Sequence, residues 1–345
     1  MDELVDEVRV RAFLAATADP AVALQIAMMD GESDQAGPPP GVLRTRISAH
    51  QEIADVLAKQ AADGSWGDAP QACRRILPTF WTAKTFSELG MTADHSGLGR
   101  ALEFLDAHTV VEDGGVSING RPDGVLSCYT GIMADMMLRA GRPDAAAGPL
   151  SWIATYQHVR YGGRDYLGVT RPVWGRYLAT RYGGCLAGTT CLLGVVKCGL
   201  ALVRARDAGL GTPEGQRVLD AIRDLLADRE VFRRRDGDVI PLGAAPTAHG
   251  PAAERWLAPA FPLTYQTDLL EMAQLAVDVD VPAERMTAAL TRIAAWRLPD
   301  GTWPMLRSCP APTCYRPERP ARRTGSRWIT LRVLRLWDSL RRGPA

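Results

Sequence analysis

The 345-residue sequence is 46% hydrophobic and 23% charged, a composition typical of globular proteins that excludes disordered and collagen-like chains. Forty basic residues against 39 acidic ones leave a formal charge of +1. The net charge of the protein therefore gives no indication that it binds nucleic acid or an anionic membrane. Lys59, Lys84 and Lys197 are the only lysines of the sequence, and its excess of arginine is typical of a GC-rich genome.

The N-terminal residues Met1 to Val8 are acidic and lack the basic region and apolar core of a secretory signal. No stretch of the sequence approaches the roughly 18 to 20 uninterrupted apolar residues that a membrane-spanning helix needs. We therefore expect a cytoplasmic protein without a transmembrane segment, whose seven cysteines are reduced thiols.

Residues 1–29 are predicted to be helical, with a break near Asp19-Pro20 and a second helical part through Met28. Residues 30–42 are acidic, rich in glycine and contain Pro38-Pro39-Pro40, so this stretch cannot hold a helix and is predicted to be a hinge. The sequence thus predicts an N-terminal helical arm with its hinge over 1–42 and a main domain over 43–345.

From about residue 45 onward, amphipathic helical runs alternate with glycine-containing turns, and almost nothing alternates with the period of two that strands need. We predict an all-α domain. Five apolar-rich helices are expected to begin near Trp81, Cys128, Gly188, Tyr265 and Trp328. Three of them are expected to end at Gly90, Gly141 and Gly209, because the left-handed end of a helix favours glycine.

More strongly charged amphipathic helices are expected between these runs, over 48–60, 97–108, 144–159, 214–229 and 283–297. Each pairs with an apolar helix, which gives a helical-hairpin repeat. Tight turns precede the apolar helices at Asp63-Gly64-Ser-Trp66, Asp113-Gly114-Gly115, Tyr182-Gly183-Gly184 and Asp300-Gly301-Thr-Trp303. A Trp after such a turn is expected to pack on the neighbouring hairpin while its indole N–H donates to a carbonyl.

Gln60-x3-Gly64-x-Trp66 resembles the QW motif of triterpene cyclases, and a turn followed by a Trp- or Cys-led helix is similar to the prenyltransferase and squalene-cyclase repeat. Residues 45–340 therefore resemble the terpenoid cyclase and protein prenyltransferase superfamily. Three stretches resemble an uncharacterised single-domain branch of it: Cys128-Tyr-Thr-Gly131, Cys185-x5-Cys191 and Phe261 to Glu271. The resemblance implies an (α/α) barrel, or toroid, in which inner helices surround a cavity and outer helices face water.

The sequence also departs from that family. Squalene-hopene cyclases protonate their substrate with an Asp-x-Asp-Asp cluster, whereas Asp278-Val-Asp280-Val lacks one carboxylate and is expected on the surface. The last QW-like site has Arg297 in place of Gln, and the Asp-rich magnesium motifs for ionising a diphosphate are absent from the sequence. These departures argue against ordinary terpene chemistry.

In such a toroid the starts of the inner helices meet at one mouth of the barrel. Asp268 is expected at one of these starts and has two interpretations. If its side chain faces the cavity, apolar neighbours raise its pKa and make it a general acid, with Tyr265 as partner or cation stabiliser. Alternatively, Asp268 caps the helix by accepting N–H bonds.

Cys128 and Cys191 are expected at helix N-termini, where the pKa of a thiol is lowered towards neutrality, whereas Cys198 is expected to be inert packing. Burial is the alternative for Cys128. Cys128, Cys185 and Cys191 could also bind Zn²⁺, with His158 or His249 as a fourth ligand. Cys309 and Cys314, and the Arg-rich segment 316–327, are expected to be loop residues. A joint metal or disulfide site for the cysteines and an anion clamp for the arginines are the alternatives.

Three functions follow. The leading hypothesis is an enzyme that cyclises or rearranges a hydrophobic or isoprenoid-like small molecule by acid initiation in a central cavity. Its expected catalytic residues are Asp268, Tyr265 and Cys128, and its expected substrate-binding residues are Trp81, Cys185, Cys191 and Trp328. The alternatives are a zinc-thiolate enzyme on the same fold, which makes zinc the possible cofactor, and a non-catalytic toroid that binds a peptide or protein partner.

Overall fold

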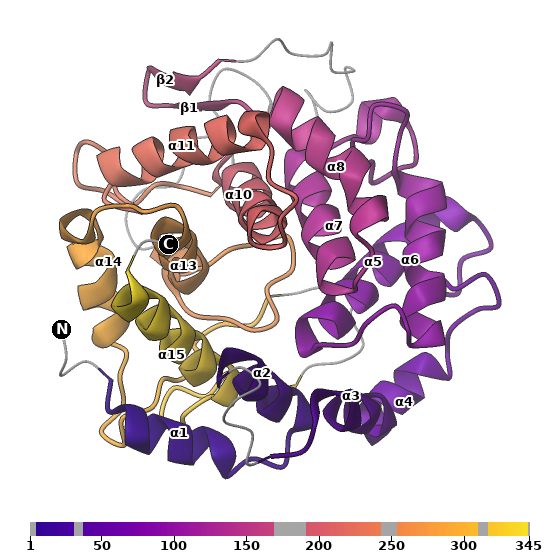
Figure 1. The fold of residues 1–345 in the computed structure, drawn as a ribbon, viewed down its shortest axis with the longest axis horizontal. Coiled ribbons are helices and arrows are strands. Elements are labelled where there is room, and N and C mark those ends of the chain that lie inside the picture. Colours follow the sequence, from indigo (N-terminus) through magenta and orange to yellow (C-terminus); the bar gives the residue numbers. More distant parts are fainter. Residues whose placement is uncertain (1–4, 31–36, 169–190, 243–253, 310–316, 344–345) are drawn as a thin grey trace.

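The computed structural model describes residues 5–30, 37–168, 191–242, 254–309 and 317–343, and within these ranges the chain is mostly helical, as predicted (Figure 1). Six helices lie nearer the centre of Figure 1 and are called the inner helices: α2 (Pro20–Asp30), α5 (Ala72–Leu89), α7 (Ser127–Arg139), α10 (Leu192–Asp207), α13 (Leu269–Asp278) and α15 (Arg327–Arg342). The others are called the outer helices: α1 (Glu7–Ala15), α3 (Pro40–Ala49), α4 (Gln51–Leu57), α6 (Ser96–Thr109), α8 (Pro143–Tyr156), α11 (Pro213–Asp228) and α14 (Ala283–Ala294).

The inner helices contact one another in a closed order. α2 contacts α5, and the contacts continue through α7, α10, α13 and α15 back to α2. Each inner helix also contacts an outer partner, in the pairs α2 with α3, α5 with α6, α7 with α8, α10 with α11, α13 with α14 and α15 with α1. Except for α3 and α4, which are both outer helices, the described helices therefore alternate between an inner and an outer position along the chain, as a helical-hairpin repeat requires.

Side-chain pairs show that neighbouring inner helices run in the same direction. Near the start of α10, Lys197 bonds Glu271 near the start of α13, and near their ends Arg206 bonds the carbonyl of Asp278. α7 and α10 are joined towards their starts by the thiol of Cys198, which donates to the carbonyl of Ser127, and near their ends by Asp135 and Arg204. α13 and α15 are joined towards their starts by Asp268 and Arg332 and near their ends by Gln274 and Ser339. The N-terminal ends of these four helices consequently lie on one side of the molecule.

The repeated turns have the predicted form. The indole N–H of Trp66 donates to the carbonyl of Val56 at 2.8 Å, and that of Trp303 donates to Ile293 at 2.9 Å. A threonine of the following inner helix accepts from the backbone N–H after each turn, in the pairs Thr79–Trp66, Thr130–Val116 and Thr330–Trp303. Gly90, Gly141 and Gly209 follow their helices with φ of 100°, 77° and 74°, which confirms the predicted helix ends.

Several boundaries differ from the sequence prediction. α5 begins at Ala72, so Trp81 lies inside the helix and not at its start, and the helix contains Pro78. α13 begins at Leu269, four residues after the predicted start at Tyr265. α3 runs across the domain boundary predicted at residue 42, and α2 packs on α3, α5 and α15. The helix predicted to reach residue 159 ends at Tyr156 and is followed by an antiparallel hairpin, β1 (Val159–Tyr161) with β2 (Arg164–Leu167).

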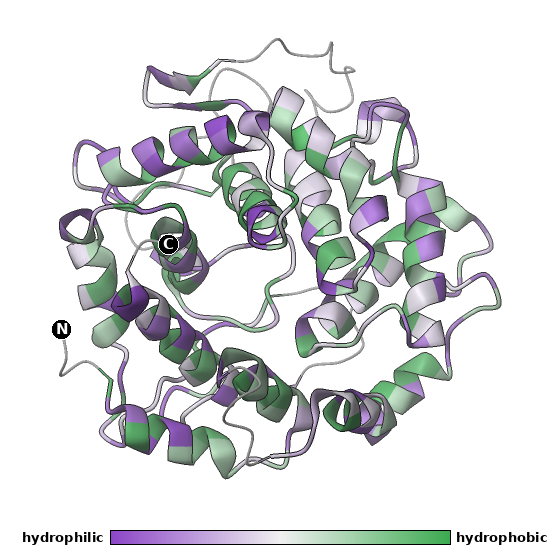
Figure 2. Ribbon diagram, viewed as in Figure 1, coloured by the Kyte–Doolittle hydropathy of each residue, from purple (hydrophilic) through white to green (hydrophobic). Residues whose placement is uncertain are grey.

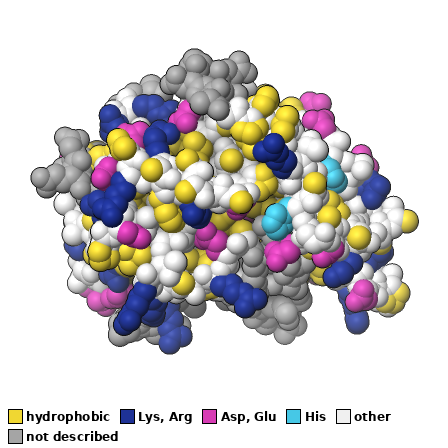
Figure 3. Space-filling view, turned by 90° about the horizontal axis from the view of Figure 1, so that it is seen from below, with side chains coloured by type: hydrophobic (Ala, Val, Ile, Leu, Met, Phe, Trp, Pro, Cys, Tyr) yellow, Lys and Arg dark blue, Asp and Glu magenta, His cyan; other side chains and the backbone are white. Residues whose placement is uncertain are grey.

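The hydropathy of an outer helix agrees with its place between the core and solvent. α11 places Val218, Ile222, Leu225 and Leu226 on one buried face, and its remaining residues give the hydrophilic colours of this outer helix in Figure 2. Charges of both signs are interspersed over the face in Figure 3, as a formal charge of +1 leads one to expect. Among the described residues, no helix is both long and apolar enough to cross a membrane.

Candidate functional site

Four aromatic rings gather where the middle of α5, the start of α7 and the segment before α13 meet. Ring centroids are 5.1 Å apart for Phe80 and Trp81, 5.4 Å for Trp81 and Tyr129, and 6.3 Å for Trp81 and Tyr265. Phe80 and Trp81 are buried, whereas Tyr265 is 40% exposed. We call these four residues the aromatic cluster; it reaches from the core to solvent at the N-terminal side of the inner helices.

The segment before α13 connects helices that are not neighbours. The ammonium of Lys84 on α5 donates to the carbonyl of Leu263, and the ring of Phe261 stacks on Trp328 of α15 with centroids 4.1 Å apart. Trp328 is the second residue of α15, as predicted, and is buried. Trp81 and Trp328 are thus both held near this segment, but each packs on a different part of it.

Asp268 is the N-cap of α13, so the capping alternative holds. Its carboxylate accepts from the N–H of Glu271 at 2.8 Å and from the N–H of Ala260 at 3.0 Å. Both oxygens also accept from Arg332 at 2.7 Å. Burial alone raises the pKa of Asp268, but Arg332 and these hydrogen bonds outweigh it and the net pKa is lowered. The expected raised pKa is wrong, and Asp268 is an ionised structural carboxylate without a proton to donate.

For Cys128 the burial alternative holds, and the lowered thiol pKa is wrong in its direction. Cys128 is the second residue of α7 and Cys191 is the N-cap of α10, as expected. Both side chains are buried, and burial, reinforced by Cys191, raises the pKa of Cys128 to about 12. The thiol of Cys128 is therefore protonated at neutral pH. Cys198 is fully buried and inert, as predicted.

The zinc hypothesis extends beyond the described residues, because Cys185, Cys314 and His249 lie outside them. Within the ranges that the structure does describe, no group of three or more potential ligands could hold a metal ion. His158 is buried, and the thiol of Cys309 accepts from Arg307 at 3.2 Å. Arg319, Arg322 and Arg323 of the Arg-rich segment are exposed, as predicted for a solvated loop.

Two buried ion pairs, one within an inner helix and one between two inner helices, were not predicted from the sequence. Lys84 pairs with Glu88 at 2.5 Å on α5, and Lys197 of α10 pairs with Glu271 of α13 at 2.6 Å. Burial lowers the pKa of Lys84 against the opposing effect of Glu88. The sequence does contain an indication of these pairs, because two of its three lysines lie within apolar helices, where a buried ammonium group needs a carboxylate partner.

The C-terminal side of α13 carries a second correction. Asp280 is exposed, as predicted, but Asp278 is partly buried and accepts a hydrogen bond from Gln274 at 2.8 Å. Burial, with a smaller contribution from the charge of Asp207, raises the pKa of Asp278 to about 6. The negative end of the α13 dipole acts in the same direction.

Asp278→Asn should therefore stabilise the protein at pH 7. The native pKa of about 6 lies above the ordinary value of 3.8, so the charged carboxylate destabilises the fold above pH 6 and this cost disappears below pH 4. A shift of about two pKa units corresponds to at most about 3 kcal/mol. Because Asp278 is partly exposed and solvent screens its charge, we expect a smaller gain of about 1 to 2 kcal/mol at pH 7 and almost none at pH 4. Urea denaturation of both proteins across this range measures it; an equal difference at both pH values would contradict the assignment.

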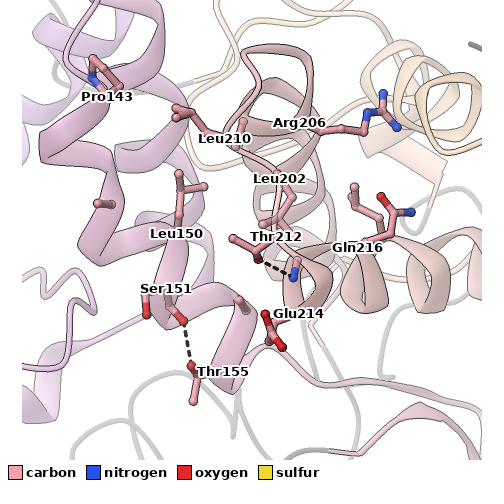
Figure 4. Close-up of a pocket in the computed structure, with 16 residues that line it drawn as sticks. Pro143, Leu150, Ser151, Thr155, Leu202, Arg206, Leu210, Thr212, Glu214 and Gln216 are labelled. Carbon is pink, nitrogen blue, oxygen red and sulfur yellow. Dashed lines mark hydrogen bonds between the residues drawn. The ribbon is translucent and has the colours of Figure 1, made fainter.

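A cavity of about 330 Å³ lies away from the aromatic cluster, between α8, the end of α10 and the start of α11 (Figure 4). Leu150, Leu202 and Leu210 give it an apolar wall, and Thr212 and Glu214 stand at its edge, where Thr212 caps α11. None of the predicted site residues lines it. It is the size of a small-ligand site but holds no group that the sequence analysis singled out.

Comparison with known proteins adds no family: no protein-family model matches the sequence, and no curated protein matches it.

Proposed function

We propose that the chain is a terpenoid-cyclase-like (α/α) toroid that binds a hydrophobic or isoprenoid-like small molecule at the aromatic cluster. The closed order of contacts among parallel inner helices, each with an outer partner, supports the toroid. The aromatic cluster supports the ligand class, because four rings from separate segments converge and one of them, Tyr265, is 40% exposed. This convergence is the observation that carries the proposal.

The chemistry that we propose is an acid-initiated cyclisation or rearrangement: a proton adds to a double bond of the ligand to give a cationic intermediate, and loss of a proton from that intermediate gives an isomeric product, so no co-reactant is consumed. The faces of Trp and Tyr rings attract a cation within about 6 Å and stabilise it by about 2 kcal/mol or more when water is excluded. Asp268 is not the acid in this proposal, because its carboxylate is ionised and saturated with donors. Its part is to hold the start of α13, and with it the preceding segment that carries Tyr265.

Binding of farnesol to the full-length protein, followed by quenching of tryptophan fluorescence, tests this proposal. We expect saturable quenching by farnesol and at least tenfold weaker affinity in Tyr265→Ala and in Trp81→Leu. Tyr156→Ala is the matched control, since Tyr156 packs on Trp152 of an outer helix and lies outside the cluster. A linear alcohol of equal length controls for non-specific partitioning. Equal affinity in the three variants, or no saturable binding, would refute the proposed site.

A further inference from the structure

Three helices border the cavity of about 330 Å³ without filling it (Figure 4). On α8, Ala147, Leu150 and Ala154 line the cavity, and their spacing places them on one face of the helix. Leu202 of α10 and Leu219 of α11 line it from the other two helices, and both are buried. The hollow follows from the short alanine side chains on this face of α8, which do not fill the space towards α10 and α11.

The connection between α10 and α11 leaves an apolar side chain uncovered at the same place. Leu210 lines the cavity and is 42% exposed, although its side chain is as apolar as that of the buried Leu202. Protein interiors are close-packed, and voids larger than a water molecule are few in a domain. A molecule bound in this space would both fill it and cover Leu210, which removes apolar surface from water.

The charges at the cavity are balanced within the protein. Arg206 and Glu214 are the charged residues among those that line it. Nε and Nη2 of Arg206 both donate to Asp207 at 3.0 Å, and its Nη1 donates to the carbonyl of Asp278 at 2.9 Å. Glu214 accepts from Arg217 at 3.3 Å. An ionic ligand would therefore meet no unbalanced opposite charge among the lining residues, and because a charge is costly to bury without a partner, the cavity favours a neutral molecule.

Two hydroxyl groups at the cavity already bond within their own helices. Thr155 donates to the carbonyl of Ser151 at 2.8 Å on α8, and Thr212 accepts from the N–H of Gly215 at 3.0 Å at the start of α11 (Figure 4). A polar group of a ligand would compete with these bonds, whereas apolar contacts would leave them intact. The lining therefore favours recognition by apolar contact.

We propose that this cavity binds a small, neutral, apolar molecule with the bulk of a bicyclic compound. A cavity of about 150 Å³ lined by apolar side chains holds one benzene molecule, so the cavity of about 330 Å³ has room for two fused rings. Its volume lies in the range of small-molecule sites, and its apolar wall supplies the contact area. This site lies apart from the aromatic cluster and does not depend on the proposed function.

Calorimetric titration of the full-length protein with 1-naphthol, a neutral bicyclic compound, tests this site. We expect saturable binding that persists in Trp81→Leu, since Trp81 belongs to the aromatic cluster. 1-Naphthoate has the same rings but carries a carboxylate, and we expect it to bind at least tenfold more weakly. Equal affinity for the two compounds, or complete loss of 1-naphthol binding in Trp81→Leu, would show that the inference is wrong.

Ala154→Phe and Ala147→Phe each place a ring in the cavity and should weaken the binding of 1-naphthol at least tenfold. Ala283→Phe is the matched control, because Ala283 is exposed at the start of α14 and does not line the cavity. Thermal unfolding without ligand should show no loss of stability in the cavity variants, and the exposed Ala147 keeps the test valid if Ala154→Phe does not fold. The inference is overturned if 1-naphthol does not bind saturably, or if the folded cavity variants bind it as tightly as Ala283→Phe.

Discussion

Asp268→Ala should lower the free energy of unfolding by about 3 to 5 kcal/mol, the cost of removing one member of a buried ion pair. The substitution removes the cap of α13 and leaves the guanidinium of Arg332 without its partner, only 16% exposed. Urea denaturation followed by circular dichroism measures the loss. A general acid at this position would instead lose activity with little change in stability.

Two further variants separate the ion pair from the cap. Asp268→Ala combined with Arg332→Met should recover part of the loss, because no unpaired charge then remains. Asp220→Ala is the matched surface control: Asp220 pairs with Arg223 at 3.1 Å but is 44% exposed, so its removal should cost less than about 1 kcal/mol. If Asp268→Ala is no more destabilising than this control, Asp268 does not form the buried ion pair with Arg332 that the structure shows.

Gly131→Ala should destabilise the protein by about 2 to 3 kcal/mol, at the upper end of the range for overpacked positions. A Cβ atom on Gly131 would lie 2.4 Å from the backbone carbonyl carbon of Lys197 and 2.6 Å from the backbone nitrogen of Cys198. Backbone atoms cannot rotate away as a side chain can, so α7 and α10 would have to separate. Thermal and urea unfolding both measure this effect.

Gly41→Ala is the control for that substitution. Gly41 also lies within a helix, α3, but a Cβ atom there would meet nothing within 4 Å. Since alanine is favoured over glycine in helices by about 1 kcal/mol, Gly41→Ala should stabilise the protein slightly. If Gly131→Ala and Gly41→Ala change stability in the same direction, the close approach of α7 and α10 is not what requires glycine in Cys128-Tyr-Thr-Gly131.

The local features of this fold could be predicted from the sequence because their causes are local. Left-handed glycines end helices, Asp-Gly turns reverse the chain, and a Trp after such a turn reaches a carbonyl ten residues earlier, as Trp66 and Trp303 do. The start of α5 was placed too late, because the helix continues through Pro78 to Ala72. The hairpin after α8 is too short, at three and four residues per strand, to give a recognisable alternation.

The candidate site was harder to predict, because its electrostatics depend on residues far apart in the sequence. Asp268 was correctly placed at a helix start, but Arg332, which decides its pKa, stands 64 residues later. Cys128 also lies at the predicted helix start, but its pKa is set by burial. How deeply a side chain is buried depends on the helices packed around it, which the local sequence does not identify. Hydrophobic periodicity can assign a residue to one face of a helix. It cannot identify which charged residue of a neighbouring helix lies opposite that face.

The contact between α2 and α15 has a consequence for how the chain is made. Gln25 and Arg335, which join these helices, are 310 residues apart, so at 5 to 20 residues per second the ribosome produces the second roughly 15 to 60 seconds after the first. Throughout that interval α2, whose Val22 and Leu24 are fully buried in the folded protein, lacks its contacts with α15. Newly made chains should therefore expose part of α2 until α15 has been released.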